Sequence, residues 1–396
     1  MSGTPLNSAG VEVRPISAEQ HTDFLASYRE ASFLENPRWA QVKTEWDHHS
    51  MGIFLGGELV GASLVLGRRL PIPAKTPVLG AKRFVYLPKG PVVDTSRVQL
   101  PEVLPAVVEY LAATGAFLIR MGVPGAVRRW DAQEVRRALS AGEHQHISQL
   151  EPLEVDEDML ALADQLRQLG WKPPVETDDF EAGQPRFQAR IPLEPAADPG
   201  DEDAVAAGVE AALARMDQTS RRQTRKSTRS ELNISVGTEA DLPAWQRLSE
   251  ETAERDGFTT RPMDYFERIH RAMNASEISE CKLLLAHYED QLLAAALYVR
   301  QGAFGWYAYG ASSSQERKRY APRRLQLQQI EDSIRAGCHW YDLGGLTPAL
   351  DPQHHLAGLT RFKTTMGADV VQTLGEWDFA VDRVLTAGFN AYMARR

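Results

Sequence analysis

Cysteine is scarce in this chain. Cys281 and Cys338 are the only two among its 396 residues, they lie far apart, and no CxxC or CxxH spacing surrounds them. This pattern argues against the common zinc frameworks and is typical of a reducing cytoplasm, where we expect the protein. A secretory signal is not predicted, because residues 1–15 lack a basic segment followed by an apolar one.

Long apolar runs are absent as well. Residues 283–299 form an apolar stretch, but His287, Glu289 and Asp290 interrupt it, which argues against a membrane span. The GxxxxGK[ST], GxSxG and HExxH patterns are missing, and with them the signatures of P-loop proteins, α/β-hydrolases and zinc proteases. His354 and His355 are direct neighbours, a spacing that gives no ligand pair on a helix or strand, so we predict no metal site and no cofactor.

The net charge of −9 argues against a general polyanion-binding protein, but two local basic runs stand out. In residues 221–229, helical spacing places four cations on one face: Arg222, Arg225, Lys226 and Arg229. The second run precedes a helix expected from Pro322, whose first N–H groups favour anions; its cations are Arg317, Lys318, Arg319, Arg323 and Arg324. Both runs are candidate sites for phosphates of a nucleic acid, and a solvated basic face is the alternative for each.

Two parts of the chain, within residues 52–122 and 284–345, share the order strand–turn–strand–strand–helix–strand. This order predicts an α+β fold with mixed sheets and is that of the GNAT acyltransferases, so two copies predict a cleft between them. Chance recurrence of a hairpin followed by a helix is the alternative. The Arg/Gln-x-x-Gly-x-Gly/Ala loop that binds coenzyme A in such folds is missing, since ERKRYA stands before the helix.

One candidate site follows the predicted strand Cys338–Leu343. That strand ends in Asp342-Leu-Gly-Gly, which delivers a carboxylate to a sheet edge where a ligand can approach closely. The loop after it closes with Phe362 and Lys363. Asp342 is expected to orient a substrate or Lys363, or to stabilise the loop, and the sequence favours none of these.

Two further candidates come from other segments. Alternation places Tyr307 and Tyr309 on one face of a strand, either as core residues or with a hydroxyl in the cleft. Lys43 lies on a short amphipathic helix expected after Asn36-Pro37, where Asn36 is a good N-cap. An ordinary solvent-exposed lysine is the alternative for Lys43.

Taken together, an ordered set of segments resembles the FemABX (FemX-like) peptidyltransferases, which use aminoacyl-tRNA to build peptidoglycan cross-bridges. The matching segments are FLENPRWAQVKTEW, LPKGPVVD, TAERDGFTTRPMDYF, WYAYGASS, YAPRRLQLQQI, WYDLGGL, LAGLTRFKTTMGAD and LGEWD. The resemblance implies two GNAT-like domains, at 1–178 plus 373–396 and at 179–372, with the C-terminal segment returning to the first. Only about 45 residues separate Leu193 from Thr238, so the coiled-coil arm of some members is not expected.

The resemblance also assigns roles. It implies that Lys43, with Arg225 or Lys226 and their neighbour Arg222, holds the phosphates of the precursor. It implies that Phe362 and Lys363 handle the aminoacyl end of the tRNA and the developing charge, and that Tyr309 lines the substrate site. Lys89 departs from the family, which usually has Arg before Gly-Pro; the charge is kept but the bidentate fork is lost.

The expected reaction is the transfer of Gly, Ala or Ser from aminoacyl-tRNA to the side-chain amine of a peptidoglycan stem peptide. The acceptor is lipid II or UDP-MurNAc-pentapeptide, and the cations of residues 317–324 are expected to contact the tRNA. A monomer is expected, with peripheral membrane association through a lipid-linked substrate. The alternatives are a tRNA-dependent amide-forming enzyme of small-molecule biosynthesis, an acetyl-CoA enzyme, or a non-catalytic tRNA-binding protein.

Overall fold

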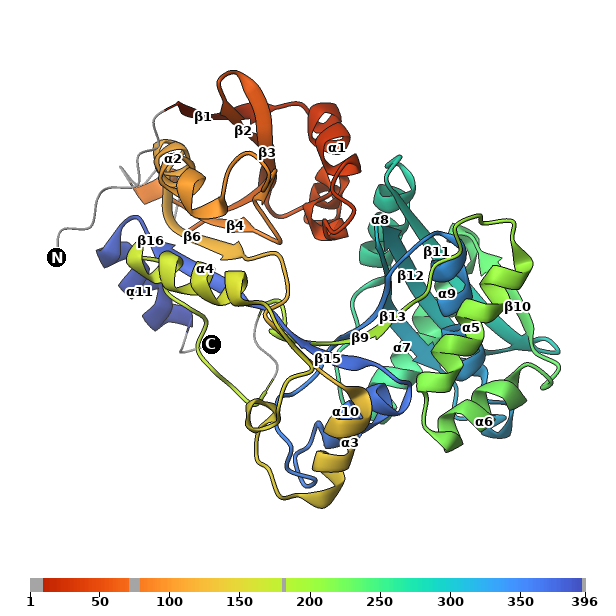
Figure 1. Cartoon of the computed structure of the whole chain (residues 1–396). Helices are drawn as coiled ribbons and strands as arrows, with labels where there is room; N and C mark the ends of the chain where they lie inside the picture. Colours follow the sequence, from red (N-terminus) through yellow and green to blue (C-terminus); the bar gives the residue numbers. More distant parts are fainter. Residues whose placement is uncertain (1–9, 71–78, 180–182, 394–396) are drawn as a thin grey trace.

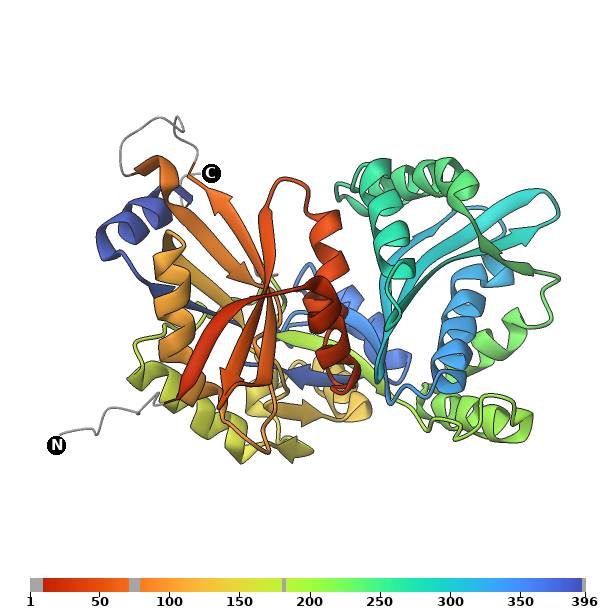
Figure 2. The same cartoon turned by 90° about the horizontal axis from the view of Figure 1, so that it is seen from above.

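The computed structural model of the chain describes residues 10–70, 79–179 and 183–393. Within them two mixed sheets stand side by side (Figures 1 and 2). The first is seven-stranded, and β5 (Val92–Val93) pairs with its third strand. Its remaining strands, in spatial order, are β1 (Val11–Ile16), β2 (Asp47–Leu55), β3 (Glu58–Arg69), β4 (Arg83–Leu87), β6 (Ala116–Gly122) and β16 (Glu376–Ala380).

The second sheet is nine-stranded. Its strands, in spatial order, are β10 (Asn233–Gly237), β11 (Ser279–Tyr288), β12 (Gln291–Gln301), β13 (Phe304–Ser312), β14 (Trp340–Gly345), β9 (Phe187–Pro192), β15 (Asp369–Gln372), β7 (Arg128–Trp130) and β8 (Glu154–Val155).

The helices cover the sheets and connect the strands. They are α1 (Ala18–Ala26), α2 (Leu100–Ala113), α3 (Ala132–Ala141), α4 (Glu157–Gln168), α5 (Glu202–Arg215), α6 (Gln218–Ser227), α7 (Leu242–Asp256), α8 (Met263–Asn274), α9 (Ala321–Arg335), α10 (Ala357–Thr365) and α11 (Arg383–Met393). Three short 3₁₀ helices matter below: η1 (Phe33–Glu35), η2 (Pro37–Val42) and η6 (Arg317–Arg319). Across the described ranges, no helix combines the length and apolar character that crossing a membrane requires.

The predicted repeat is present as topology. The elements β2-β3-β4-α2-β6 and β11-β12-β13-α9-β14 follow the same order, and in each unit only the last two strands run parallel. The flanking strands correspond too, because β1 and β10 begin the two sheets and β16 and β9 each pair antiparallel with the last strand of the unit. The first hairpin turns at Gly56 and Gly57, whose positive φ angles explain why glycine is needed there. The predicted α+β class with mixed sheets is confirmed.

Each half has its own core, and a third core joins them. Leu100, Val103, Leu104, Val107 and Leu111 recur at helical spacing along α2 and pack on the first sheet. The third cluster combines residues of η1 and η2 with residues of the second half: Leu34, Trp39, Ala40, Val42, Trp245, Phe266, Ile269 and Leu283. Figure 2 shows the red N-terminal helical segments between the two lobes. The halves therefore share buried surface along η1 and η2.

The chain crosses between the halves more than once. Strand β16 returns to pair with β6, as the prediction of a returning C-terminal segment requires. Strands β7 and β8, by contrast, leave the first half and extend the second sheet. The proposed division at residues 178/179 and 372/373 stays a prediction, and its outermost residues, 1–9 and 394–396, lie outside the described residues.

Several local predictions were wrong. The acidic segment of roughly residues 126–170 is predicted from its sequence to be helical, but it contains β7 and β8 besides α3 and α4. Residues 358–363, expected to close a loop, lie in helix α10, and the helix after Pro37 is a 3₁₀ helix. Asn36 does cap it, accepting from the N–H of Arg38 at 3.0 Å. The coiled-coil arm is absent from the described residues between β9 and β10, where only α5 and α6 stand.

Candidate functional site

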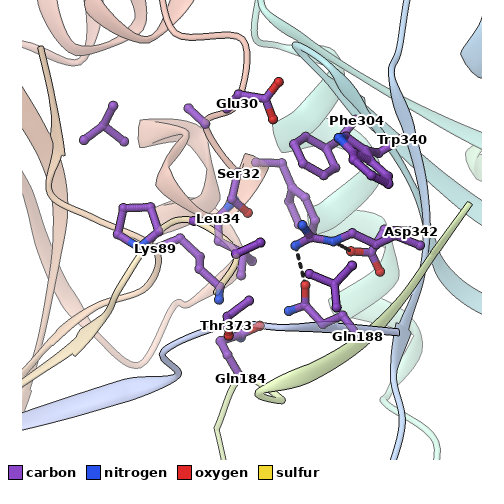
Figure 3. A pocket seen from close by; sticks show the side chains of 18 of the residues that line it. Glu30, Ser32, Leu34, Lys89, Gln184, Gln188, Phe304, Trp340, Asp342 and Thr373 are labelled. Atoms are coloured by element: carbon purple, nitrogen blue, oxygen red, sulfur yellow. Dashed lines mark hydrogen bonds and ion pairs between the residues drawn. The ribbon is translucent and has the colours of Figure 1, made fainter. Parts of the chain in front are cut away.

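A cavity of about 1620 Å³ lies between the two halves. Its wall takes Trp39, Lys43 and Lys89 from the first half, and residues before α8 and along β13, β14 and β9 from the second. In the close-up, Lys89 lies across the cavity from Trp340 and Asp342, with Gln184 and Thr373 between them (Figure 3). The cavity is large enough for an extended polar ligand that contacts both halves.

Two cations meet in this wall. Lys43 follows η2, and its Nζ lies 5.5 Å from the ring centroid of Trp39 and 5.7 Å from that of Tyr265. Burial lowers the pKa of Lys43, and the nearby charge of Arg261 lowers it further. The Arg261 guanidinium carbon lies 5.5 Å from the same Tyr265 ring. Like charges held together beside aromatic faces make a site for an anion with several oxygens.

The sequence reasoning placed Lys43 in the site but missed Arg261. Arg261 stands alone in the loop before α8, without the neighbouring cations that drew attention to residues 221–229. Its presence in the segment TAERDGFTTRPMDYF, directly before a proline and four residues before Tyr265, was the available signal.

Tyr307 and Tyr309 both line the cavity, but their rings pack in different cores. The hydroxyl of Tyr309 donates to that of Tyr265 at 3.4 Å, and its ring packs edge-on against Phe266 at 5.1 Å. A β-bulge leaves Ala308 unpaired between them, so Tyr307 packs against the other core of the second half. Burial raises the pKa of Tyr307 to about 12. The predicted shared face was wrong because the bulge interrupts the alternation.

Asp342 lines the cavity but is held on both oxygens. Its Oδ2 accepts from Nε of Arg190 at 3.0 Å, and its Oδ1 accepts from the N–H of Gly344 at 2.6 Å. Figure 3 draws the first of these contacts and the one to Gln188, which accepts from Arg190 at 2.5 Å. Gly344 has a φ of 80°, which permits the backbone to turn near the end of β14, where its pairing with β9 is irregular. The carboxylate therefore fixes the turn at the cavity floor.

Lys363 lies behind this floor. Its Nζ donates to the carbonyl oxygen of Gly345 at 2.5 Å, and the residue is 7% exposed and does not line the cavity. Burial lowers the pKa of Lys363 to about 8, and the charge of Asp342 opposes the shift. Phe362, on the outer side of α10, is 36% exposed and also lies outside the cavity wall.

The first basic run lies away from the cavity. Arg222, Arg225 and Lys226 sit on α6, at the outer end of the second half (Figure 1), and none of them lines the cavity. Arg225 pairs with Glu210 at 2.5 Å, and Nζ of Lys226 lies 5.4 Å from the Tyr320 ring centroid. Arg222, Arg225 and Lys226 share one helix as predicted, but the helix ends at Ser227, before Arg229, and its basic face turns to solvent and to α5.

The second basic run is partly held inside the protein. Arg319 contacts Glu316, Glu231 and the ring of Tyr288. Arg323 donates to the sulfur of Met366 at 3.0 Å and Arg324 to Gln328 at 3.2 Å, and burial lowers the pKa of both. Lys318 and Arg317 are both exposed, the first with a weak 3.9 Å pair to Glu316 and the second reaching Ser314 at 3.5 Å.

The two neighbouring histidines lie in a turn. The Nε2 atoms of His354 and His355 lie 3.7 and 3.3 Å from Oδ1 of Asp179. These three are the group within the described ranges whose ligand atoms converge. Two of the three side chains are more than half exposed, and a histidine–carboxylate contact accounts for the arrangement.

Comparison with known proteins adds to this geometry. The chain matches the model of the FemAB family over residues 16–273 and 270–393. It is 22% identical to the lipid II:glycine glycyltransferase of Staphylococcus epidermidis over 445 residues, covering 95% of this chain and 94% of that protein. The protein of the same name from Staphylococcus aureus is also 22% identical, over 450 residues, with the same coverage.

Among solved structures, FemX aligns with a TM-score of 0.72 and 19% identity, covering 94% of this chain and 98% of that one. This likeness, with the repeated strand order, confirms the predicted fold of two GNAT-like domains. The predicted enzyme class, an aminoacyltransferase, is confirmed as well. Because the family model covers nearly the whole chain, the protein belongs to the FemAB family.

Proposed function

We propose that this protein transfers an amino acid from aminoacyl-tRNA to the side-chain amine of a peptidoglycan precursor in the cytoplasm. The observation that carries the proposal is the cavity between the halves, which gathers the cation pair of Lys43 and Arg261, an aromatic wall and the Asp342 turn. The curated relatives are named for glycine and lipid II, so glycine and lipid II are the first donor residue and acceptor to test.

In this proposal Lys43 and Arg261 bind the diphosphate of the precursor. The two side chains come from different halves and share the face of Tyr265, so one ligand can contact both. Arginine grips two oxygens at once, and lysine adds a point charge. Arg261 thereby takes the role that the family resemblance implied for Arg225 or Lys226, since those two lie outside the cavity.

The amine of the stem peptide then attacks the ester carbonyl carbon of the aminoacyl-tRNA. A C–N bond forms, the ester C–O bond breaks, and the proton that the neutral amine loses passes, directly or through water, to the leaving oxygen, which becomes the tRNA hydroxyl. An ester becomes an amide, so no nucleoside triphosphate is required. Positioning of the two substrates supplies roughly 7–11 kcal/mol of the barrier.

Lys363 supports this step from behind the floor. Its ammonium group binds the carbonyl of Gly345, which lines the cavity together with Gly344, so a buried positive charge lies directly behind this lining. A charge there stabilises the negative oxygen of the tetrahedral intermediate, an effect worth a few kcal/mol, on the order of one oxyanion-hole donor. Asp342 holds the Gly344–Gly345 backbone in place between the Lys363 ammonium group and the cavity.

The tRNA is proposed to contact the surface at η6, where Arg317 and Lys318 are exposed. Their contacts are long, 3.5 Å to Ser314 and 3.9 Å to Glu316, and both side chains can turn to meet phosphates. Arg319, Arg323 and Arg324 support this loop and the start of α9 through their internal contacts. Replacing Lys318 by Ala is expected to weaken tRNA binding most at low salt, because exposed charge pairs are screened.

The test is a transfer assay with purified protein, tRNA charged with labelled glycine, alanine or serine, and either lipid II or UDP-MurNAc-pentapeptide. The proposal requires label in one acceptor with at least one amino acid. If tRNA binds but no label reaches either acceptor, the proposal fails. The protein is then either a non-catalytic tRNA-binding protein or an amide-forming enzyme with a small-molecule acceptor.

A further inference from the structure

Two adjacent residues outside the cavity wall, Glu35 and Asn36, are polar and fully buried, each 0% exposed. They connect η1 to η2, the segment that lies between the halves. Burying a carboxylate and an amide together is unfavourable unless each finds partners. The partners show that each residue grips a different half of the molecule.

Glu35 grips the first half. Its Oε2 accepts from the N–H of Leu64 in β3 at 3.0 Å, and its Oε1 accepts from the N–H of Lys89 at 3.0 Å. The site is built around this carboxylate, because a Cβ on Gly90 would lie 2.4 Å from Oε2. Burial raises the pKa of Glu35 to about 7, and these N–H groups oppose the shift. Glu35 thus fixes the turn that carries the cavity-lining Lys89.

Asn36 grips the second half. Its Nδ2 donates to Oγ of Ser276 at 2.8 Å and to Oε1 of Gln301 at 2.9 Å, with Oγ of Ser279 at 3.3 Å. All three partners are buried. Ser276 follows the end of α8, while Ser279 and Gln301 end the paired strands β11 and β12. One side chain therefore ties the start of η2 to three elements of the other half.

We call Glu35 and Asn36, with their hydrogen bonds to the two halves, the staple. Helix η2 links the staple to the cation pair of Lys43 and Arg261. The helix starts after Asn36, packs along α8, and ends at Val42, directly before Lys43. Asn36 is tied near the C-terminal end of α8, whereas Lys43 lies beside Tyr265 in the first turn of α8, close to Arg261. A shift at Asn36 therefore displaces Lys43 relative to Arg261.

We propose that Glu35 and Asn36 are positioning residues that hold Lys43 opposite Arg261, so that the precursor's phosphates are bound by both halves at once. The inference rests on the proposed function, since it assigns the cation pair to the acceptor. Neither residue touches the substrate; each acts through the placement of the N-terminal segment between the sheets.

The test compares Asn36→Ala and Glu35→Gln with Ser50→Ala, which removes a buried hydrogen bond of similar size. Ser50 accepts or donates at 2.9 Å to His21 in the first half, and neither residue lines the cavity. Dissociation constants for the acceptor that the wild type uses are measured by calorimetry, and Tm is measured for every variant. Ser276→Ala serves as a milder variant if Asn36→Ala does not fold.

Asn36→Ala and Glu35→Gln are each expected to weaken acceptor binding by about tenfold, because each misplaces the charge-assisted contact between Lys43 and the phosphates. The KM for aminoacyl-tRNA should stay unchanged, and Ser50→Ala should lower Tm without changing acceptor binding. In a Lys43→Ala background, Asn36→Ala should add little further loss, because both act on the same contact.

The positioning role would be overturned if Asn36→Ala weakened acceptor binding equally in the wild-type and Lys43→Ala backgrounds. It would also be overturned if Ser50→Ala weakened acceptor binding as much as Asn36→Ala does. This outcome differs from failure of the proposed function. If wild-type protein binds neither lipid II nor UDP-MurNAc-pentapeptide, the function fails; if it binds and the staple variants bind equally well, only the inference fails.

Discussion

The two halves carry the same cross-strand ion pair with the charges exchanged. In the second half, Asp342 on β14 is opposite Arg190 on β9, with 3.0 Å between Oδ2 and Nε. In the first half, Arg120 on β6 is opposite Asp378 on β16, with 2.8 Å between Nε and Oδ1. The repeat therefore extends to single side-chain contacts, although only one of the two pairs lies at the cavity.

The halves differ in how far their parallel strands stay together. Strands β4 and β6 pair from Arg83 to Leu87, whereas β13 and β14 pair only from Phe304 to Trp306 and then part. Asp342, opposite Trp306 in the last pair, and Gly344 beyond it line the cavity, whereas among the described residues β4 and β6 supply no part of its wall. The same topology therefore gives two different halves. In the first, closed half the parallel strands stay paired and the cavity wall receives Lys43 and Lys89; in the second, open half the strands part and form the cavity floor.

The largest effect is expected at the floor of the open half. Lys363→Met removes the buried charge with little change in shape and should lower kcat by about 100-fold while KM for the acceptor changes little. Steady-state transfer kinetics with Tm as a folding control measure this. A rise in KM with kcat unchanged would place Lys363 in binding instead.

The next largest effect is on the acceptor KM, and it distinguishes the cations of the cavity wall from those on the outer surface. Lys43→Ala and Arg261→Ala should each raise the acceptor KM by about tenfold or more, since each removes a charge-assisted contact. Arg225→Ala, on α6, is the matched control and should leave it unchanged. Strong loss with Arg225→Ala alone would move the phosphate site to the outer basic face.

A smaller effect tests the exchanged ion pairs directly. Asp342→Asn should lower kcat by roughly tenfold, because the turn at Gly344 and the Arg190 contact both weaken. Asp378→Asn removes the carboxylate from the ion pair of the closed half, with Arg120, and should lower Tm without changing kcat. Similar kinetic losses in both variants would mean that the comparison between an open and a closed half is wrong.

The smallest effect is in the pH dependence. Because burial lowers the pKa of Lys363 to about 8, its cation disappears above that pH in the folded protein, and kcat should decline there. Lys363→Arg, which stays charged, should remove this alkaline decline. The pKa in the unfolded chain is higher, so this group contributes most to stability at high pH, and the contribution is lost as pH falls towards 8.

Much of this architecture was readable from the sequence because it is local. Helical spacing along α2 and the Gly56–Gly57 turn predict one repeat unit, and the same order recurs later. Asp342, Tyr309 and Lys43 were placed in the site from their segments, and all three line the cavity.

The remainder depends on contacts between distant residues. Arg261 becomes a partner of Lys43 only when α8 packs on η2, and no neighbouring cations mark it. The basic run on α6 is dense in charge, yet its position in the fold points it outward. The bulge at Ala308 and the exchanged pair Arg120–Asp378, which spans most of the chain, are likewise invisible to local periodicity.

A crystal structure with bound UDP-MurNAc-pentapeptide tests the central claim most directly. The account predicts the diphosphate between Lys43 and Arg261 and the diamino-acid amine within reach of the Asp342–Gly344 turn, in the open half. A diphosphate bound on α6, or a stem peptide lying over β4 and β6, would contradict it.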